Sequence, residues 1–338
     1  MPPLTPRRLT LSIGALLFAL ALSVAVCSSL GSSGYTLLDL LRQTADEETA
    51  RAMILRVRLP RILMAALAGA ALGAAGAVFQ AVLRNPLADP YVLGVSGGAA
   101  LGAFAATALG LPALVPLLPV RAAAAFLGAI ATVAILFLLS SARGRIVSYP
   151  MLLIGVIMNT IYLALILLIE TVVEFSRLHG VRLWMIGTIP IEEYGLITGL
   201  SVVLVPGVVG LAVFGRDLNL MTAGEEAARS LGVTVERTRV LSVVLASLIT
   251  AVAVSVAGPI GFVGLIVPHG ARLVFGPDHR LLVPASALTG AVFLIAADTL
   301  ARTVMAPTEI PVGVVTALCG GPFFLWLYRR RAGGGYFE

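Results

Sequence analysis

Long and nearly uninterrupted apolar runs, separated by short polar segments, dominate this chain. An α-helix needs about 20 apolar residues to cross about 30 Å of hydrocarbon, whereas strands of a membrane barrel alternate apolar and polar positions over about ten residues. The pattern therefore predicts an all-α, polytopic transmembrane helix bundle with about ten spans, forming a single domain over residues 1–338. The predicted spans are 9–30, 61–81, 91–109, 120–140, 150–170, 195–214, 240–257, 259–268, 281–303 and 311–328.

Two of these runs have unusual compositions. The run 259–268 lies in the sequence GPIGFVGLIVPHG and is too short to cross the membrane as a helix. Irregular segments persist at membrane depth when they are buried in protein, so we expect a short, packed helix there. In the second run, Gly69, Gly73 and Gly76 fall on one helix face and allow another helix to approach closely.

The composition agrees with a membrane protein. Of the 338 residues, 59% are hydrophobic and 12% are charged, and mean hydropathy is +1.02. Soluble domains have about 45–50% apolar and about 25% charged residues. The first apolar run follows Arg7 and Arg8 and is longer than the 7–15 residues that are usual for a signal peptide, so we interpret it as an uncleaved span with a cytoplasmic N-terminus.

Every one of the 23 basic residues is arginine, and the formal net charge is +6. A P-loop requires a lysine, and so does Schiff-base chemistry. We therefore expect no catalytic residue, and any ATP and Mg²⁺ would be bound by a partner ATPase. Cys27 and Cys319 lie in apolar runs without metal-ligand spacing, so neither a metal nor a bound cofactor is expected on this chain.

Alternation of the spans from a cytoplasmic start places both termini in the cytoplasm. Most of the arginines then fall in cytoplasmic segments, which favours this orientation. Five arginines from Arg42 to Arg61 do not, because they precede the second span on the outside.

Three stretches carry a recognisable family pattern. They are RLPRILMAALAGAALGAAGAVFQAVLRNPLADPYVLGVSGGAALGA from Arg58 to Ala103, GEEAARSLGV with AGPIGFVGLIVPHGARLVFGPDHR within 224–280, and AADTLAR with EIPVGVVTALCGGPFFLWLYRR. Together they resemble the permease subunits of FecCD/vitamin B12-type ABC importers, which carry ferric siderophores, haem or cobalamin.

The resemblance implies ten helices per subunit and a homodimer with the translocation pathway at its axis. It also implies two ATP-binding cassette subunits docked from the cytoplasm and a periplasmic substrate-binding protein outside. The expected location is the inner or plasma membrane of a bacterium or archaeon. Membrane lipid is an expected partner, and nucleic acid is not.

The cytoplasmic loop after the sixth span predicts a short helix over about 222–232. Thr222 fits an N-cap with Glu225 at position N3, Arg229 lies towards the negative helix end, and Gly232 is placed to end the helix. The resemblance implies that this is the coupling helix that contacts the ATPase; an ordinary solvated connector is the alternative. The implied contact residues are Thr222, Gly224, Glu225, Glu226, Ala227, Ala228, Arg229, Leu231 and Gly232.

Arginines at the outer mouth are candidates for docking the binding protein. By resemblance, Arg58, Arg61 and Arg302 would receive its acidic residues, and Arg56 is a weaker candidate. The planar guanidinium suits a carboxylate, and complementary charge steers docking. Two alternatives remain: Arg58 and Arg61 could anchor the helix at lipid headgroups, and Arg302 could pair with Asp298 four residues earlier on the same helix.

Polar groups within apolar spans are the default candidates for a pathway. Gln80, Asn159 and Thr160 are the pathway candidates, with interhelical hydrogen bonding as the alternative. An ion-coupled secondary transporter is the alternative function, but it usually needs intramembrane acids, and Asp298 is the one acid that qualifies. The cargo stays open among siderophore, haem and cobalamin, although the sequence GVIMN in the fifth span slightly favours cobalamin.

Overall fold

A computed structural model describes residues 4–31, 35–36, 47–112, 119–142, 145–146 and 148–332. Within these ranges, seven helices are long and apolar enough to cross a membrane, and three shorter apolar helices accompany them. The predicted all-helical bundle is confirmed, while the count of ten spans stays a prediction. The elements are α1 (Pro6–Ser29), α2 (Glu47–Ala52), the π-helix η1 (Met53–Arg58), α3 (Leu59–Val82), α4 (Val95–Ala108), α5 (Val120–Ser140), β1 (Ser141–Ala142), β2 (Arg145–Ile146), α6 (Ser148–Val172), α7 (Phe175–Met185), α8 (Tyr194–Val213), α9 (Gly215–Ala223), α10 (Glu225–Ser230), α11 (Val235–Ala257), α12 (Val263–Phe275), α13 (His279–Thr303) and α14 (Val312–Ala332).

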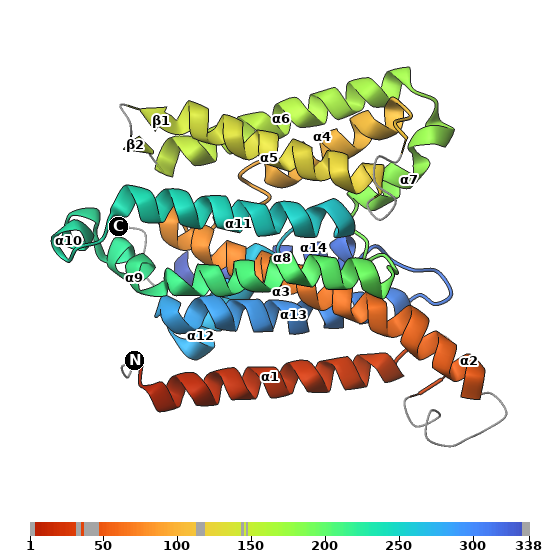
Figure 1. The fold of residues 1–338 in the computed structure, drawn as a ribbon, viewed down its shortest axis with the longest axis horizontal. Helices are drawn as coiled ribbons and strands as arrows, with labels where there is room; N and C mark the ends of the chain where they lie inside the picture. The colour runs from red at the N-terminus through yellow and green to blue at the C-terminus, as the bar shows by residue number, and fades with distance from the viewer. Residues whose placement is uncertain are drawn as a thin grey trace.

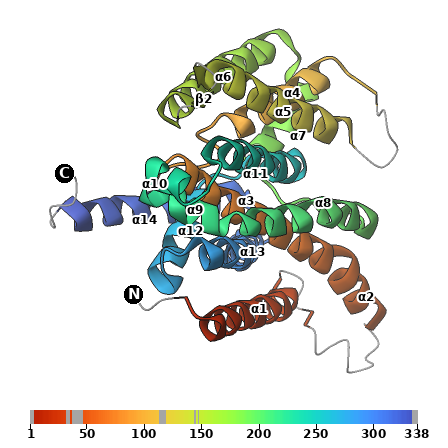
Figure 2. The same cartoon turned by 60° about the vertical axis from the view of Figure 1, so that its left-hand side comes forward.

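The long helices run roughly parallel to one another along the bundle, as Figures 1 and 2 show. Helices α9 and α10 lie at one end, where α1 begins and α14 ends, and α2 and α7 lie at the other end (Figure 1). Helix α3 occupies the centre of the bundle. In the continuous helix Glu48–Val82, which contains α3, 78% of an apolar 18-residue stretch is buried, against 17% for the corresponding stretch of α6 and 6% for that of α1. A helix that exposes leucine and valine on most of its surface suits a lipid environment or a partner subunit.

Small residues let α3 cross its neighbours at close range. A Cβ added to Gly69 or Gly73 would collide with backbone carbonyls of α13, and one added to Gly76 would collide with the carbonyl of Gly264 in α12. The predicted close approach along this glycine face is therefore confirmed.

The helix of the second span begins earlier in the chain than the sequence predicted. Helices α2, η1 and α3 form one continuous apolar helix from Glu48 to Val82, interrupted by a π-helical turn in which the N–H of Leu59 donates to the carbonyl of Ile54. The prediction began this helix near residue 61. Of the arginines in this extension, Arg58 is buried, whereas Arg51 and Arg56 are exposed.

The two short helices α4 and α12 each start after an interruption of the helical chain. Gly94 precedes α4 with φ of 86°, while Gly258 and Phe262 precede α12 with φ of 73° and 69°. Because these backbone conformations cannot continue a helix, α12 begins only at Val263. It ends at Phe275, before Gly276 with φ of 96°. The predicted short helix exists, but the range 259–268 was wrong by several residues at each end.

Candidate functional site

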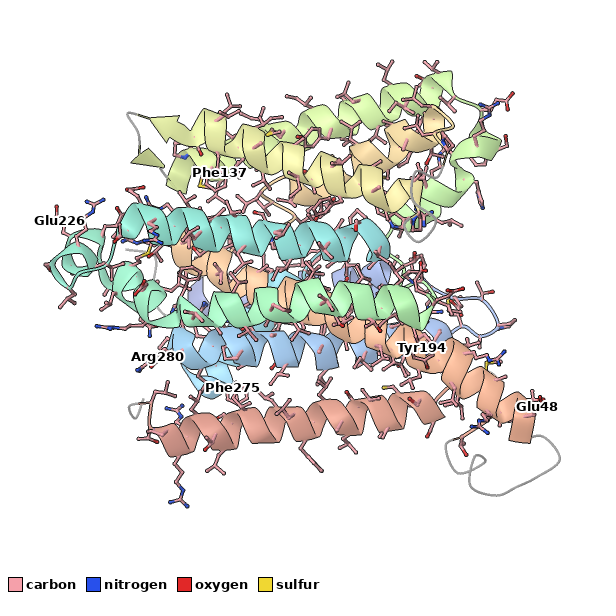
Figure 3. The ribbon with its side chains drawn as sticks, in the orientation of Figure 1. Glu48, Phe137, Tyr194, Glu226, Phe275 and Arg280 are labelled. Carbon is pink, nitrogen blue, oxygen red and sulfur yellow. The ribbon has the colours of Figure 1, made fainter. Side chains whose placement is uncertain are left out.

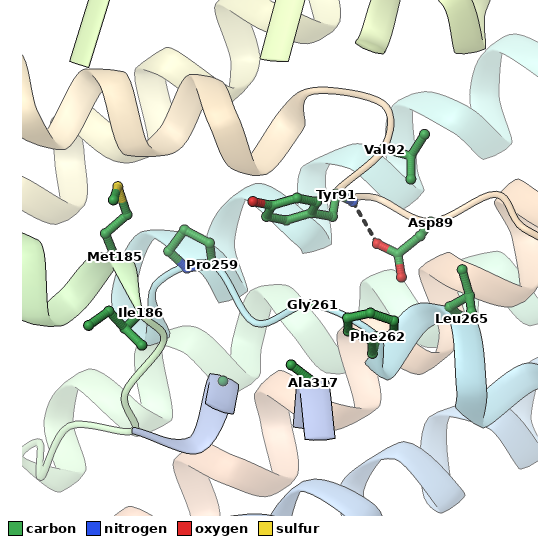
Figure 4. Close-up of a pocket in the computed structure, with 11 residues that line it drawn as sticks. Asp89, Tyr91, Val92, Met185, Ile186, Pro259, Gly261, Phe262, Leu265 and Ala317 are labelled. Atoms are coloured by element: carbon green, nitrogen blue, oxygen red, sulfur yellow. Dashed lines mark hydrogen bonds between the residues drawn. The ribbon is translucent and has the colours of Figure 1, made fainter. Parts of the chain in front are cut away.

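The interruptions before α4 and α12 border two adjacent hollows in the bundle. One has a volume of about 450 Å³ and lies between α4, α6 and the segment 83–94. The other has a volume of about 320 Å³ and includes residues just before and within α12 (Figure 4). Tyr91, Val92, Met185 and Pro259 belong to both walls, so the two hollows share a boundary.

The wall of the larger hollow is mostly apolar. Asn159 and Thr160, both predicted as pathway residues, line it from α6. The Asn159 side-chain amide donates to the carbonyl of Tyr91 at 2.9 Å, which fixes α6 to the segment 83–94. The described wall carries no charged side chain. Such a surface can accommodate a bulky, partly apolar molecule without binding it through ions.

Asp89, which the sequence reasoning did not single out, lines the smaller hollow. Its Oδ1 accepts a hydrogen bond from the N–H of Tyr91 at 2.7 Å, and its Oδ2 accepts none from the described residues (Figure 4). Burial raises the pKa of the Asp89 carboxyl to about 6, because desolvation disfavours the charged form. The only signal in the sequence is an acid that precedes Pro90 between two apolar runs.

Gln80 does not line either of these two hollows, and its role in a pathway stays a prediction. Its side chain is buried and its Nε2 lies 3.3 Å from the carbonyl of Gly264 and 3.4 Å from that of Leu265. Its Oε1 accepts a hydrogen bond from Arg272 at 3.1 Å. Gln80 therefore joins α3 to α12, as the alternative of interhelical hydrogen bonding expected.

Arg58 lies inside the protein, so the prediction that it presents its charge outside was wrong. The residue is 3% exposed, and its Nη1 donates to the carbonyls of Ser28 at 2.9 Å and Tyr35 at 2.7 Å. Arg302 is also buried and donates to the carbonyl of Cys27 at 2.7 Å. The last carbonyls of a helix lack intrahelical donors and attract cations. These two arginines therefore cap the C-terminal end of α1.

Arg61 and Arg302 flank one buried carboxylate, which explains why neither is displayed for docking. Asp298 is 1% exposed and accepts two hydrogen bonds from Arg61 Nε at 3.0 and 3.1 Å. Arg302 Nε lies 3.8 Å from Asp298 Oδ2, which confirms the alternative pairing within α13. Arg61 also contacts the exposed Glu309 at 2.8 Å.

Exposed arginines lie earlier on the same long helix, at the end of the bundle that carries α2 and α7. Arg51 in α2 and Arg56 in η1 are both exposed, so Arg56 is a stronger surface candidate than the sequence suggested. Arg42, the first of the five outer arginines, lies outside the described residues.

The predicted coupling helix consists of two short helices joined at Gly224, which has φ of 151°. Thr222 belongs to the last turn of α9, and its hydroxyl donates to the carbonyl of Asn219 at 2.8 Å. The predicted capping box was therefore wrong: α10 begins at Glu225 without a side-chain cap. The predicted stop at Gly232 is confirmed, because this residue follows the C-cap Leu231 of α10 and has φ of 85°.

One face of α10 is buried and the opposite face is exposed. Ala228 packs with Met221, Val233 and Val235 in a small apolar cluster. This packing fixes the helix to α9 and α11, so the helix moves with them rather than as a loose loop. Of the contact residues predicted from sequence, those that are exposed are Thr222, Glu226, Ala227, Arg229, Leu231 and Gly232.

The fold defines a multi-pass membrane protein with a hollow between its helices and a rigid helical projection at one end. The chain belongs to the FecCD transport family, whose model matches residues 15–330.

It is 45% identical over 284 residues to the cobalamin import system permease protein BtuC of Halobacterium salinarum, covering 84% of this chain and 75% of that protein. It is 38% identical to the hemin transport system permease protein HmuU of Yersinia pestis, covering 94% of this chain and 96% of that protein. A solved structure assigned to the metal-chelate type of ABC transporter, in an inward-facing conformation, superposes with a TM-score of 0.82 at 30% identity, covering 95% of this chain and 99% of the other.

Proposed function

We propose that this chain is the membrane-spanning permease subunit of an ATP-driven ABC importer for an iron chelate or cobalamin. Membership of the FecCD transport family over residues 15–330 carries this proposal. The apolar hollow beside α6 supports it, because a bulky chelate can pass such a wall without being held by charges. We place the importer in the inner or plasma membrane of a bacterium or archaeon.

A homodimer completes the pathway in this proposal. The larger hollow has a volume of about 450 Å³ and borders α6, whose surface is mostly exposed and apolar. Pockets for drug-sized ligands measure about 300–1,000 Å³, and haem and cobalamin are bulky compounds. Two copies that pair along α6 would join their hollows into one passage at the dimer axis.

Two ATP-binding subunits supply the energy, and they dock on the exposed face of α10. The chain has no lysine for a P-loop and is not itself an enzyme; ATP and Mg²⁺ are held by the partner. A helix packed against α9 and α11 can transfer a push from the ATPase to the membrane helices. Of the coupling residues predicted from sequence, Glu226, Ala227, Arg229 and Leu231 are exposed and available for this contact.

A substrate-binding protein delivers the cargo at the opposite end. We assign its docking surface to the outward extension of α2 and η1, where Arg51 and Arg56 are exposed. Complementary charge at such a rim speeds encounter and sets orientation more than it adds affinity.

Co-expression with candidate ATP-binding subunits tests the proposal, because an importer should purify as a complex of two permease and two ATPase chains. Vesicles that contain this complex and the binding protein should accumulate radiolabelled cyanocobalamin, haemin or ferrichrome only with ATP. The control carries an ATPase subunit that binds ATP without hydrolysing it. Uptake that needs no ATPase and follows a proton gradient would instead support the ion-coupled secondary transporter.

A further inference from the structure

Three arginines converge on the carboxylate of Glu225, the first residue of α10. Its oxygens lie 2.5 Å from Arg239 in α11, 3.6 Å from Arg229 in α10 and 3.9 Å from Arg84, two residues beyond the end of α3. The next residue, Glu226, is exposed at the far end of the molecule (Figure 3). Two adjacent glutamates on this six-residue helix therefore have different surroundings.

Building on the proposed function, we propose that Glu225 is a positioning residue that connects α10 to the end of α3 within this chain. Through this contact, movement of α10 under the ATPase would reach the wall of the hollow. Glu226, in contrast, faces the ATP-binding subunit.

The contact with Arg239 is the strongest of the three. The Arg239 side chain is 4% exposed and that of Glu225 is 34% exposed, so the pair is partly withdrawn from water. A buried guanidinium needs nearby anions, and Arg239 has a second one in Glu236 at 3.3 Å. Glu225 thereby fixes the start of α10 to α11, and Glu236 still neutralises Arg239 when Glu225 is changed.

Arg84 links this cluster to the hollow. Its Nη2 donates to the carbonyl of Met221 in α9 at 2.6 Å, in addition to its contact with Glu225. Its φ of 47° is uncommon for a residue other than glycine, and the contacts with α9 and α10 hold it there. Arg84 is thus attached to both short cytoplasmic helices at once.

The segment that follows Arg84 leads directly to the cavity wall. Tyr91 and Val92 line both hollows, and the carbonyl of Tyr91 accepts the hydrogen bond from Asn159 of α6. A continuous series of polar and covalent links therefore connects α10, the segment 83–94 and α6. Such a series becomes a coupling route only if a change at one end alters function at the other.

Complexes in vesicles with the ATP-binding subunit and binding protein test this assignment, with cyanocobalamin, haemin and ferrichrome as probes. The variants are Glu225→Gln, Arg84→Gln, their double mutant, and Glu226→Gln as the matched control. Three quantities are measured: complex assembly, ATP hydrolysis, and cargo transported per ATP hydrolysed. For Glu225→Gln we expect assembly and hydrolysis close to wild type but about a fivefold or greater loss of cargo per ATP, the scale of a typical coupling between sites.

Because Glu225 and Arg84 form one contact, the double mutant should transport no less cargo per ATP than Glu225→Gln alone. Glu226→Gln should instead weaken assembly. The Arg84 side chain is half-exposed, so Arg84→Gln should fold. This variant replaces Glu225→Gln in the test if Glu225→Gln fails to fold.

Unchanged cargo per ATP in Glu225→Gln overturns the inference, as does additive loss in the double mutant. Loss of ATPase binding in Glu225→Gln, but not in Arg84→Gln, also overturns it, because Glu225 would then contact the partner directly. Failure of the wild-type chain to assemble with any ATP-binding subunit rejects the proposed function itself, which separates the two failures.

Discussion

Replacing Asp298 by asparagine tests whether the outer arginines stabilise the fold or serve as a docking surface. The substitution keeps the shape of the side chain and removes the charge that Arg61 and Arg302 share. In the structure this carboxylate is 1% exposed and accepts two hydrogen bonds from Arg61, with Arg302 Nε 3.8 Å away. Asp298→Asn therefore leaves two positive side chains in a buried site without their common anion.

The expected cost follows from this burial. Removing one partner of a buried ion pair costs about 3–5 kcal/mol, because the other charge is left uncompensated. Arg61 keeps its contact with Glu309 at 2.8 Å, and Arg302 keeps the carbonyl of Cys27 at 2.7 Å. These remaining contacts place the loss at the lower end, about 3 kcal/mol. For a chain of this size, such a loss lowers the melting temperature by about 4 °C.

Thermal unfolding of the purified protein in detergent, followed by scanning fluorimetry, measures this shift. Glu309→Gln is the matched control: Glu309 contacts the same Arg61, but its side chain is 57% exposed. An exposed ion pair contributes about 1 kcal/mol or less, so the control should unfold close to wild type. Arg61→Met combined with Asp298→Leu should recover part of the loss, because it removes both partners of one pair.

One result would refute this reasoning. If Asp298→Asn unfolds at the wild-type temperature while Arg61→Ala and Arg302→Ala weaken binding of the substrate-binding protein, the arginines face outward, as the sequence suggested. Equal shifts for Asp298→Asn and Glu309→Gln would also contradict it, because burial would then have no effect on the cost.

Three further predictions concern other sites. Asp278→Ala should destabilise the protein by about 1 kcal/mol, because it removes the N-cap of α13. The hydrogen bond from Arg280 lowers the pKa of Asp278 to about 2. The ionised carboxylate therefore stabilises the fold above its ordinary pKa, and this contribution is lost as pH falls through about 2. The difference in melting temperature between wild type and Asp278→Ala should shrink on acidification. Gly76→Ala should cost about 1–3 kcal/mol, because its methyl group would collide with a carbonyl of α12; Gly199→Ala, whose methyl group meets no atom within 4 Å, should leave the melting temperature unchanged or raise it. Asp89→Asn should stabilise the protein at pH 7, because the folded state holds the Asp89 proton more tightly than the unfolded chain does. The wild-type free energy of unfolding therefore falls by up to about 3 kcal/mol as pH rises from about 4 to about 6. The melting temperature of the variant, measured across this range, should lack that decrease.

Local pattern was sufficient for the helices themselves. Residues 120–140 were predicted as a span and form α5, Val120–Ser140, because an apolar run of that length forms a helix in any arrangement of its neighbours. The stop at Gly232 was predictable for a similar reason, since a helix commonly ends where glycine adopts a left-handed conformation. The capping box at Thr222 failed, because the residues before Gly224 continue α9 rather than starting a new helix.

The side-chain environments required the tertiary structure. Arg58 and Arg56 are two residues apart on one helix, yet Arg58 caps the end of α1 and Arg56 is exposed. Asp89 lies in a short connection, yet it is buried beside α12, far along the chain. Hydropathy and glycine positions are local properties, so the sequence alone determined a helical membrane bundle and its breaks. The environment of a charged side chain depends on which distant helix packs beside it, and only the tertiary structure decided that.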